Sequence, residues 1–218
     1  MPKPPKTKPA TRPRTRNAEA TRRTLLAAGE ALFAKHGFDG ATVDAIVDHA
    51  KVNKALIAYY FKSKAGLYEA IIADVVAVVL ARAEAAELPA LAPTERLAAW
   101  IRVLTEAIAA RPTFASILMR EYLDGRMQTR KAPAQTIAGL FRTTEAIYAD
   151  GRKAGVFREM EPHLLHLSIV GAIVFFMLTA PFREAVRRKG ILDLSTPDTE
   201  ALIMHMQTMV VEGARRRD

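Results

Sequence analysis

The chain has 218 residues, of which 50% are hydrophobic and 25% charged, a composition that predicts one or two folded domains and excludes a wholly disordered chain. It contains no cysteine, which excludes a disulfide framework, a cysteine nucleophile and any thiolate metal site. The net charge of +9 lies mostly in the first third, because residues 1–70 hold 13 Lys and Arg against 6 Asp and Glu. Such clustered charge favours nucleic acid or an acidic membrane surface as a partner, with an ordinary solvated basic face as the alternative.

The first sixteen residues, Met1–Arg16, contain five prolines and six Lys or Arg residues but no acidic residue. They lack the apolar core that a secretory signal peptide needs. We expect a disordered basic arm, of the kind that reaches into a minor groove or follows phosphates. A solubilising tail without defined contacts is the alternative.

Four helices are predicted before residue 90, at 18–36, 42–50, 53–61 and 64–87, because apolar residues recur at helical spacing. Gly37 stands where a C-terminal cap is expected. Thr42, Asn53 and Ser63 each stand where a side chain can accept from the free N–H groups of the following helix.

Five further helices follow the prolines at 89 and 93, and they centre on 97–108, 114–122, 137–148, 162–188 and 198–214. No segment shows the alternation typical of a strand. The sequence therefore predicts an all-α protein of about nine helices. We expect the arm at 1–16, a helix-turn-helix domain at 17–65 and a larger helical domain at 66–218.

The segment from Pro162 to Pro181 contains no Asp, Glu, Lys or Arg, and its length would allow a membrane span. Polar residues interrupt it, however, and a helix that is apolar all round also fits a buried core or a subunit interface. We expect a cytoplasmic protein without a membrane partner and keep a membrane-associated protein as an alternative.

The predicted helices 42–50 and 53–61 are joined by a tight break at Lys51 and Val52, which is a helix-turn-helix pattern. The second helix would be about 13 Å long and would fit the major groove of DNA, which is about 12 Å wide. Lysines there supply charge, and tyrosine hydroxyls can bond phosphates or base edges. The predicted DNA-binding residues are Thr42, Asn53, Lys54, Ala55, Tyr59, Tyr60, Lys62 and Lys64. For Tyr59, a purely packing role is the alternative, and for Lys62 the alternative is a solvated side chain without a contact.

Residues 21–72 resemble, without a gap, the N-terminal domain of the TetR/AcrR family of transcriptional repressors. The resemblance rests on the helix end at 33–37, the Thr42 cap and the block YYFKSK at 59–64, which is highly specific to this family. The other two thirds of the chain match the family only in the number and placement of helices.

The resemblance implies roles for single residues. Thr42 and Lys64 would contact phosphates, Lys54 and Ala55 would lie at the base edges, and the two tyrosines at 59 and 60 would contact backbone or bases. Three positions depart from the family pattern. Glycine is common where Lys51 stands, tyrosine is frequent at position 58, which is alanine here, and histidine is frequent at position 60.

The resemblance also implies a homodimer on a palindromic operator, released by a small-molecule inducer. Helices 162–188 and 198–214 are the candidates for the dimer interface, with an intramolecular core as the alternative. A Met- and Phe-rich cavity would suit an apolar or aromatic inducer. The predicted lining residues are Phe114, Met119, Tyr122, Phe141, Tyr148, Phe175, Phe176 and Met177, each of which also fits plain core packing. Asp74 and Glu121 interrupt apolar stripes, and each would orient a ligand, face solvent or pair with an arginine.

Two other functions fit part of the sequence. A metal-dependent enzyme would use His163 and His166, which share a helical face near Glu161, with His205 approaching in the fold. The alternative is that these are structural or pocket histidines. The sequence has no HExxH motif, phosphate loop or nucleophile elbow, however. A non-specific basic DNA-binding protein would explain the charge but not the near-neutral helical remainder. We therefore predict a ligand-responsive transcriptional repressor that is not an enzyme and needs no metal or cofactor.

Overall fold

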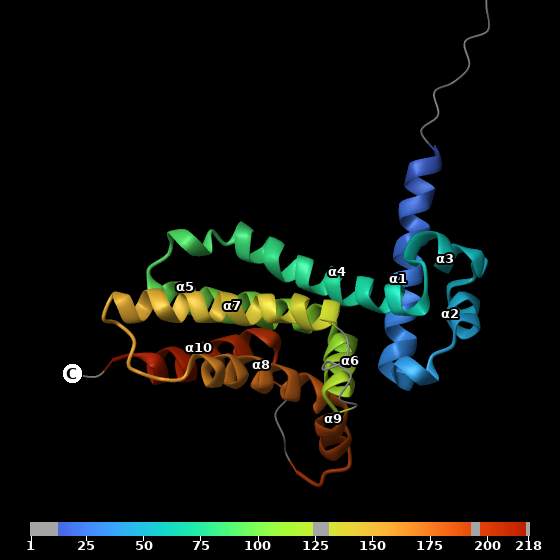
Figure 1. Ribbon diagram of the computed structural model, residues 1–218. Helices are drawn as coiled ribbons and strands as arrows, with labels where there is room; N and C mark the ends of the chain where they lie inside the picture. Colours follow the sequence, from blue (N-terminus) through green and yellow to red (C-terminus); the bar gives the residue numbers. More distant parts are fainter. Residues whose placement is uncertain (1–12, 124–130, 193–196, 217–218) are drawn as a thin grey trace, which may run out of the picture. The chain divides into compact units, whose positions relative to one another are not determined.

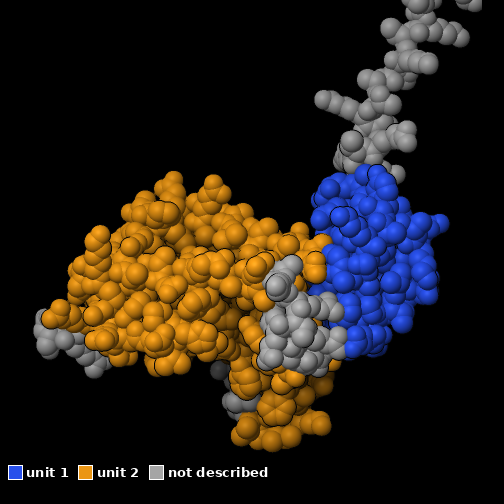
Figure 2. All heavy atoms as spheres, viewed as in Figure 1, with its two compact units in different colours: residues 1–68 blue, residues 69–218 orange. Residues whose placement is uncertain are grey.

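The computed structural model describes residues 13–123, 131–192 and 197–216, and within these ranges it is helical, with no strand (Figure 1). The chain divides into two compact units, which Figure 2 colours separately: unit 1, residues 1–68, and unit 2, residues 69–218. The division falls inside helix α4, three residues after the boundary expected from the sequence.

Unit 1 contains three helices and the start of a fourth. They are α1 (Pro13–Gly40), α2 (Val43–Ala50), α3 (Ala55–Phe61) and the first residues of α4 (Lys64–Ala85). Helix α1 begins at Pro13, so residues 13–16 of the expected arm are helical, and residues 1–12 lie outside the described part of the chain. The helix is interrupted at Gly37, whose φ of 71° is the left-handed conformation expected of a glycine cap.

The core of unit 1 contains a cluster of aromatic rings among aliphatic side chains. The ring of Phe33 on α1 lies 5.0 Å, centroid to centroid, from that of Tyr68 on α4 and 5.8 Å from that of Phe38. Ile57 and Phe61 on α3 are also buried. Packing of this inner face fixes the orientation of α3 and leaves its opposite face in solvent.

Unit 2 holds the rest of the chain. Its elements are the remainder of α4, the short 3-10 helix η1 (Leu88–Ala90), α5 (Pro93–Ala110), α6 (Pro112–Leu123), α7 (Lys131–Lys153), α8 (Pro162–Leu178), α9 (Ala180–Arg188) and α10 (Thr199–Ala214). The described part thus has ten α helices, because the helix predicted at 162–188 is broken at Thr179 into α8 and α9. Pro181 has no backbone N–H to continue the hydrogen-bond ladder at that point.

Helix α5 is the centre of unit 2 and packs against α7, α8 and α10, which run alongside it in Figure 1. Its residues Leu97, Trp100 and Ile101 are fully buried. At the surface, the guanidinium of Arg102 donates to both carboxylate oxygens of Glu200 on α10, at 2.7 and 2.6 Å. Such a two-point pair fixes the register of two helices as well as holding them together.

No single helix in the described ranges is long and apolar enough to cross a membrane. Only α8 and α9 taken together pass that test of length and composition, and the two are bent by 44°.

Candidate functional site

Helix α2 and the turn after it are built as the sequence predicts. The Thr42 hydroxyl accepts from the backbone N–H of Ala45 at 3.1 Å and caps the helix. Lys51 ends the helix with a φ of 54°, in the left-handed region that glycine adopts without strain. The departure from glycine at this position therefore leaves the turn intact and places the strain on Lys51.

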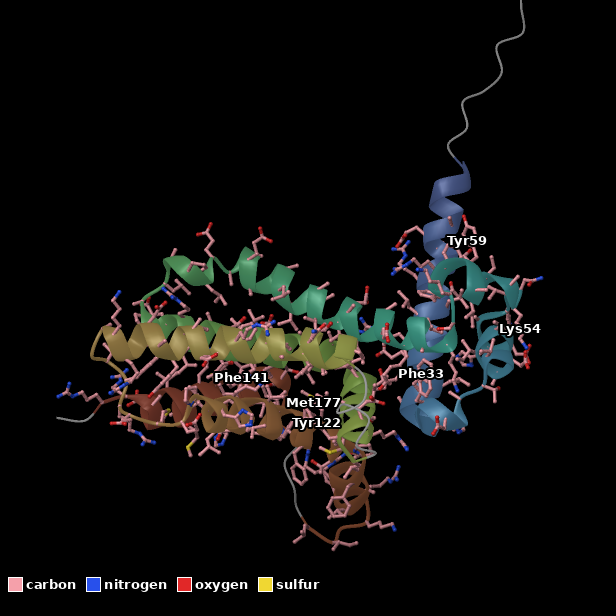
Figure 3. All side chains as sticks on the ribbon, in the orientation of Figure 1. Phe33, Lys54, Tyr59, Tyr122, Phe141 and Met177 are labelled. Atoms are coloured by element: carbon pink, nitrogen blue, oxygen red, sulfur yellow. The ribbon has the colours of Figure 1, made fainter. Side chains whose placement is uncertain are left out.

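Helix α3 presents one polar and aromatic face to solvent. Its start is fixed by Asn53, whose side-chain oxygen accepts from the N–H of Ala55 at 2.8 Å. Lys54, Ala55 and Tyr59 are exposed, and 77% of Tyr59 is accessible (Figure 3). Tyr60 is half-buried and meets the Tyr59 ring edge-on, with the centroids 4.8 Å apart. The exposed face holds donors and flat rings, which are the groups that contact base edges and phosphates.

Lys54 has a partner that the sequence reasoning did not foresee. Its ammonium lies 2.6 Å from a carboxylate oxygen of Asp44 on α2, and both side chains are largely exposed. An exposed ion pair contributes little stability, between about 0 and 1 kcal/mol. It does bring Lys54 and the first turn of α2 to the same side of unit 1.

The two other lysines predicted to touch phosphates differ in their surroundings. Lys62 is exposed at the end of α3 with a φ of 67°. Lys64 is partly buried, and its ammonium donates to the carbonyls of Phe38, at 2.9 Å, and Ala41, at 3.0 Å. Two of its three N–H donors are thus used inside unit 1, where they hold the chain between α1 and α2.

Unit 2 contains a cavity of about 330 Å³ among its helices. Three of the residues that the sequence analysis names, Phe114, Met119 and Tyr122 on α6, line this cavity. The lining is otherwise aliphatic except for one histidine. Its other members are Val79, Leu104, Ile108, Leu118, Ile137, Leu140, His166, Leu167, Val170, Gly171 and Val174.

The other five residues predicted to line a cavity do not line this one. Tyr148 is buried against the Phe157 ring, and its hydroxyl accepts from the N–H of Met160 at 3.0 Å. Phe175 is 66% exposed, and the Phe176 ring lies under the guanidinium of Arg183. Phe141 lies against two histidine rings, and Met177 is half-buried on α8 (Figure 3).

The polar group of the cavity wall that the sequence reasoning missed is His166. Its Nδ1 lies 2.9 Å from the hydroxyl oxygen of Thr144, which also accepts from the indole N–H of Trp100 at 2.9 Å. Burial, together with a smaller effect of the neighbouring His163, lowers the pKa of His166 to about 4. The ring is therefore neutral at physiological pH. A histidine inside an uncharged helix is the available signal, and it fits a structural or pocket histidine as well as a metal ligand.

The remaining polar candidates have other surroundings. Asp74 on α4 pairs with Arg111 at 2.6 Å. Glu121 is 2% exposed, and its Oε2 has no hydrogen-bond partner among the described residues. His163 is exposed beside Phe141, and within the described ranges no three acidic or histidine side chains gather as a metal site would require.

A second hollow, about 660 Å³, runs between α8 and α10 and is open to solvent. It is lined mainly by apolar side chains such as Leu164 and Met209, each 62% exposed, with Glu161, His205 and Arg158 among them. Exposed apolar surface on two neighbouring helices is typical of a protein interface.

The fold and the exposed helix α3 define a helix-turn-helix regulator with a larger helical domain. Residues 25–71 match the family model described as bacterial regulatory proteins, tetR family, and residues 93–211 match the tetracyclin repressor-like C-terminal domain. The chain belongs to the tetR family. It is a ligand-responsive transcriptional repressor that binds operator DNA as a homodimer.

Relatives and solved structures agree with this membership. The transcriptional regulator RutR of Escherichia coli K12 is 26% identical over 204 residues, which cover 94% of this chain and 95% of RutR. The repressor NicS of Pseudomonas putida is 28% identical over 151 residues, covering 67% of this chain and 70% of NicS. The regulator FadR of Bacillus subtilis, solved with stearoyl-CoA, shares the fold with a TM-score of 0.70 at 20% identity, covering 88% of this chain and 98% of that one.

Proposed function

We propose that α3 enters the major groove of the operator with Lys54, Ala55 and Tyr59 at the base edges. The observation that supports this most is the exposed outer face of α3, set against an inner face fixed by Ile57 and Phe61. Helices presented in this way place their first residues closest to the bases.

The flanking residues would contact the backbone. Thr42 at the start of α2 and Lys62 at the end of α3 are exposed and would meet phosphates. Asn53 keeps its NH₂ group as a donor, because its oxygen is used for the cap, and Tyr60 would direct its hydroxyl to the backbone. Lys64 has one N–H left for a phosphate, so its larger contribution would be to hold the chain before Thr42 in place.

The Lys54→Ala variant tests the assignment of α3. A base contact should be worth about 1–3 kcal/mol and its loss should relax specificity at one operator position, whereas loss of a phosphate contact weakens all sequences alike and lowers the salt slope by about 1. The control is Asp44→Asn, which removes the partner charge and should strengthen binding to any duplex. Equal weakening of specific and random DNA by Lys54→Ala would contradict a base contact.

We propose that the 330 Å³ cavity of unit 2 binds the inducer and that this inducer is small and largely apolar or aromatic. Its size lies at the lower end of the usual range for ligand pockets, about 300–1,000 Å³, and its aliphatic wall suits an apolar ligand. The complex of FadR with stearoyl-CoA also has an apolar chain in its ligand. Ligand binding would favour one position of α4, whose residues belong to both units, and so weaken DNA binding by about 1–3 kcal/mol.

Filling the cavity tests this site. Val170 is a half-buried lining residue on α8, and Val170→Phe should abolish release of the operator by apolar compounds while leaving operator binding intact. Val78→Phe is the matched control, because Val78 is exposed on α4 and does not line the cavity. Release that survives Val170→Phe would place the inducer elsewhere.

We propose that the hollow between α8 and α10 is closed by the same surface of a second copy. The apolar residues exposed there, including Leu164 and Met209, would then be buried in the dimer. Met209→Arg should give monomers in analytical ultracentrifugation and abolish operator binding, whereas Leu80→Arg, at an exposed position on α4, should not. The protein would act in the bacterial cytoplasm, where its operator lies.

A further inference from the structure

Among its described lining residues, the cavity of unit 2 has a single polar group deep in its wall, the imidazole of His166. Only 8% of this residue is exposed, and it lines the cavity together with apolar neighbours on α8 such as Val170. Tyr122, the other lining residue with a polar side-chain atom, is 55% exposed and so belongs to the outer edge.

Three side chains from three helices form a hydrogen-bond chain that ends at His166. The indole N–H of Trp100 on α5 can only donate, so the hydroxyl oxygen of Thr144 on α7 accepts from it at 2.9 Å. The hydroxyl hydrogen of Thr144 then has two possible acceptors. These are Nδ1 of His166 at 2.9 Å and the carbonyl of Leu140 at 3.4 Å. We assign the hydroxyl hydrogen to the nearer of the two, which makes Nδ1 an acceptor.

The tautomer of His166 follows from that assignment. A neutral imidazole has one N–H, so when Nδ1 accepts, the hydrogen is on Nε2. Among the residues that the structure describes, Thr144 is the only hydrogen-bond partner of the ring, so Nε2 has none. Nε2 is not among the fully buried polar atoms that lack a partner, and the cavity is the open space that His166 lines.

We propose that His166 is the specificity-determining residue of the inducer site and that its Nε2–H donates to an uncharged acceptor, such as a ketone oxygen, on a largely apolar ligand. This proposal rests on the cavity being the inducer site. Thr144 acts as a positioning residue, because its hydroxyl sets which nitrogen of His166 carries the hydrogen. Since the described residues that line the cavity carry no charge, a carboxylate there would lose its water shell without a counter-ion.

Three matched probes test the proposal by isothermal titration calorimetry: 4-phenylcyclohexanone, phenylcyclohexane and 4-phenylcyclohexanecarboxylate. They share one apolar body and differ in the acceptor. We expect the wild-type protein to bind the ketone roughly threefold to tenfold more tightly than the hydrocarbon, the net worth of one hydrogen bond. We expect the carboxylate to bind more weakly than the ketone.

Variants separate the donor from the shape of the cavity. His166→Phe should bind the hydrocarbon as before and lose the ketone preference, and His166→Gln, which keeps an N–H donor, should restore part of it. Thr144→Val should reduce the preference without weakening the hydrocarbon, a split that a purely structural role would not produce. His163→Phe is the matched control one turn earlier on α8, outside the cavity lining, and should bind all three probes like the wild-type protein.

Several results would overturn the proposal: no preference for the ketone in the wild-type protein, an unchanged preference in His166→Phe, or binding of none of the probes. Release of the operator is measured in parallel on the same variants. If the ketone binds through His166 but does not release the operator, the assignment of the cavity as the inducer site fails, and the role of His166 in ligand specificity within the cavity stands.

Discussion

Units 1 and 2 hold their important polar groups in opposite ways. In unit 1 most of these groups are exposed, and caps act over two or three residues: Asn53 accepts from Ala55, and Thr42 accepts from Ala45. Lys64 is the exception, because it is partly buried and donates to carbonyls 26 and 23 residues away. In unit 2 the corresponding groups are buried, and residues distant in the sequence position them. Trp100 is 44 residues from its partner Thr144, and Thr144 is 22 residues from His166.

This difference matches the two ligands. DNA is large and charged, so its site needs donors standing in solvent on a rigid helix, and short-range caps suffice for that. A small apolar ligand needs an enclosed wall assembled from several helices, with its polar groups held in position before the ligand arrives. We expect a substitution at a polar group of unit 1 to change the structure locally, and a substitution at a buried polar group of unit 2 to affect several of its helices.

The largest expected effect is that of Gly66→Ala. A Cβ at Gly66 would lie 1.9 Å from the carbonyl oxygen of Phe61, an overlap with backbone that no rotamer can relieve. We expect roughly 2–3 kcal/mol of lost stability in unit 1, with loss of DNA binding and intact ligand binding in unit 2.

The measurement for this variant is thermal unfolding followed by circular dichroism, together with operator and probe titrations. Gly139→Ala on α7 is the control, because a Cβ there meets only the end of Arg142, at 3.8 Å. If Gly66→Ala lost DNA binding and probe binding to the same extent, the two units would not unfold independently, which would contradict this prediction.

The same contrast explains what the sequence could predict. The caps at Thr42, Asn53 and Ser63 and the positive φ at Gly37 depend on residues nearby in the sequence, so their spacing was enough, and the structure confirms them. The family resemblance added the identities of the residues on α3.

The cavity could be predicted only in part. Three of the eight expected lining residues, all on α6, do line it, because the apolar spacing of one helix was readable. Which other helices face α6 depends on packing between distant segments, so Tyr148 and Phe175 were expected in the cavity but lie elsewhere. The pairing of His166 with Thr144 has no signature in local spacing.

An intermediate effect is expected from pH. The pKa of His166 is about 4 in the folded protein, below the ordinary value of 6.5, so between these values the unfolded chain binds more protons. The stability that this group contributes is complete above pH 6.5 and falls as the pH is lowered to 4. We expect a loss on the order of 2 kcal/mol once contact of the ring with solvent in the cavity is allowed for.

Urea unfolding of unit 2 at several pH values measures this loss, with His166→Phe as the comparison that lacks the titrating group. The difference in unfolding free energy between the two proteins should change between pH 6.5 and 4 and be flat above. A difference that is constant across this range would contradict a neutral, buried His166.

The smallest effect is expected from Lys51→Gly. Lys51 has a left-handed backbone that costs an L-residue about 1–2 kcal/mol, and part of the gain from glycine is offset by its greater freedom in the unfolded chain. We expect unit 1 to gain roughly 0.5–1 kcal/mol, seen as a higher Tm, with no change in ligand binding by unit 2. A lower Tm would mean that the Lys51 side chain makes a stabilising contact that outweighs the strain.

The most direct test of the whole account is selection of DNA by the intact protein from a pool of random duplexes, at fixed salt and with excess competitor. The account predicts enrichment of one palindromic sequence bound by two chains, weakened by Lys54→Ala and released by the ketone probe. A pool that stays random after repeated selection, with weak binding to every duplex, would contradict the account and leave only the basic charge of unit 1 as the basis for binding DNA.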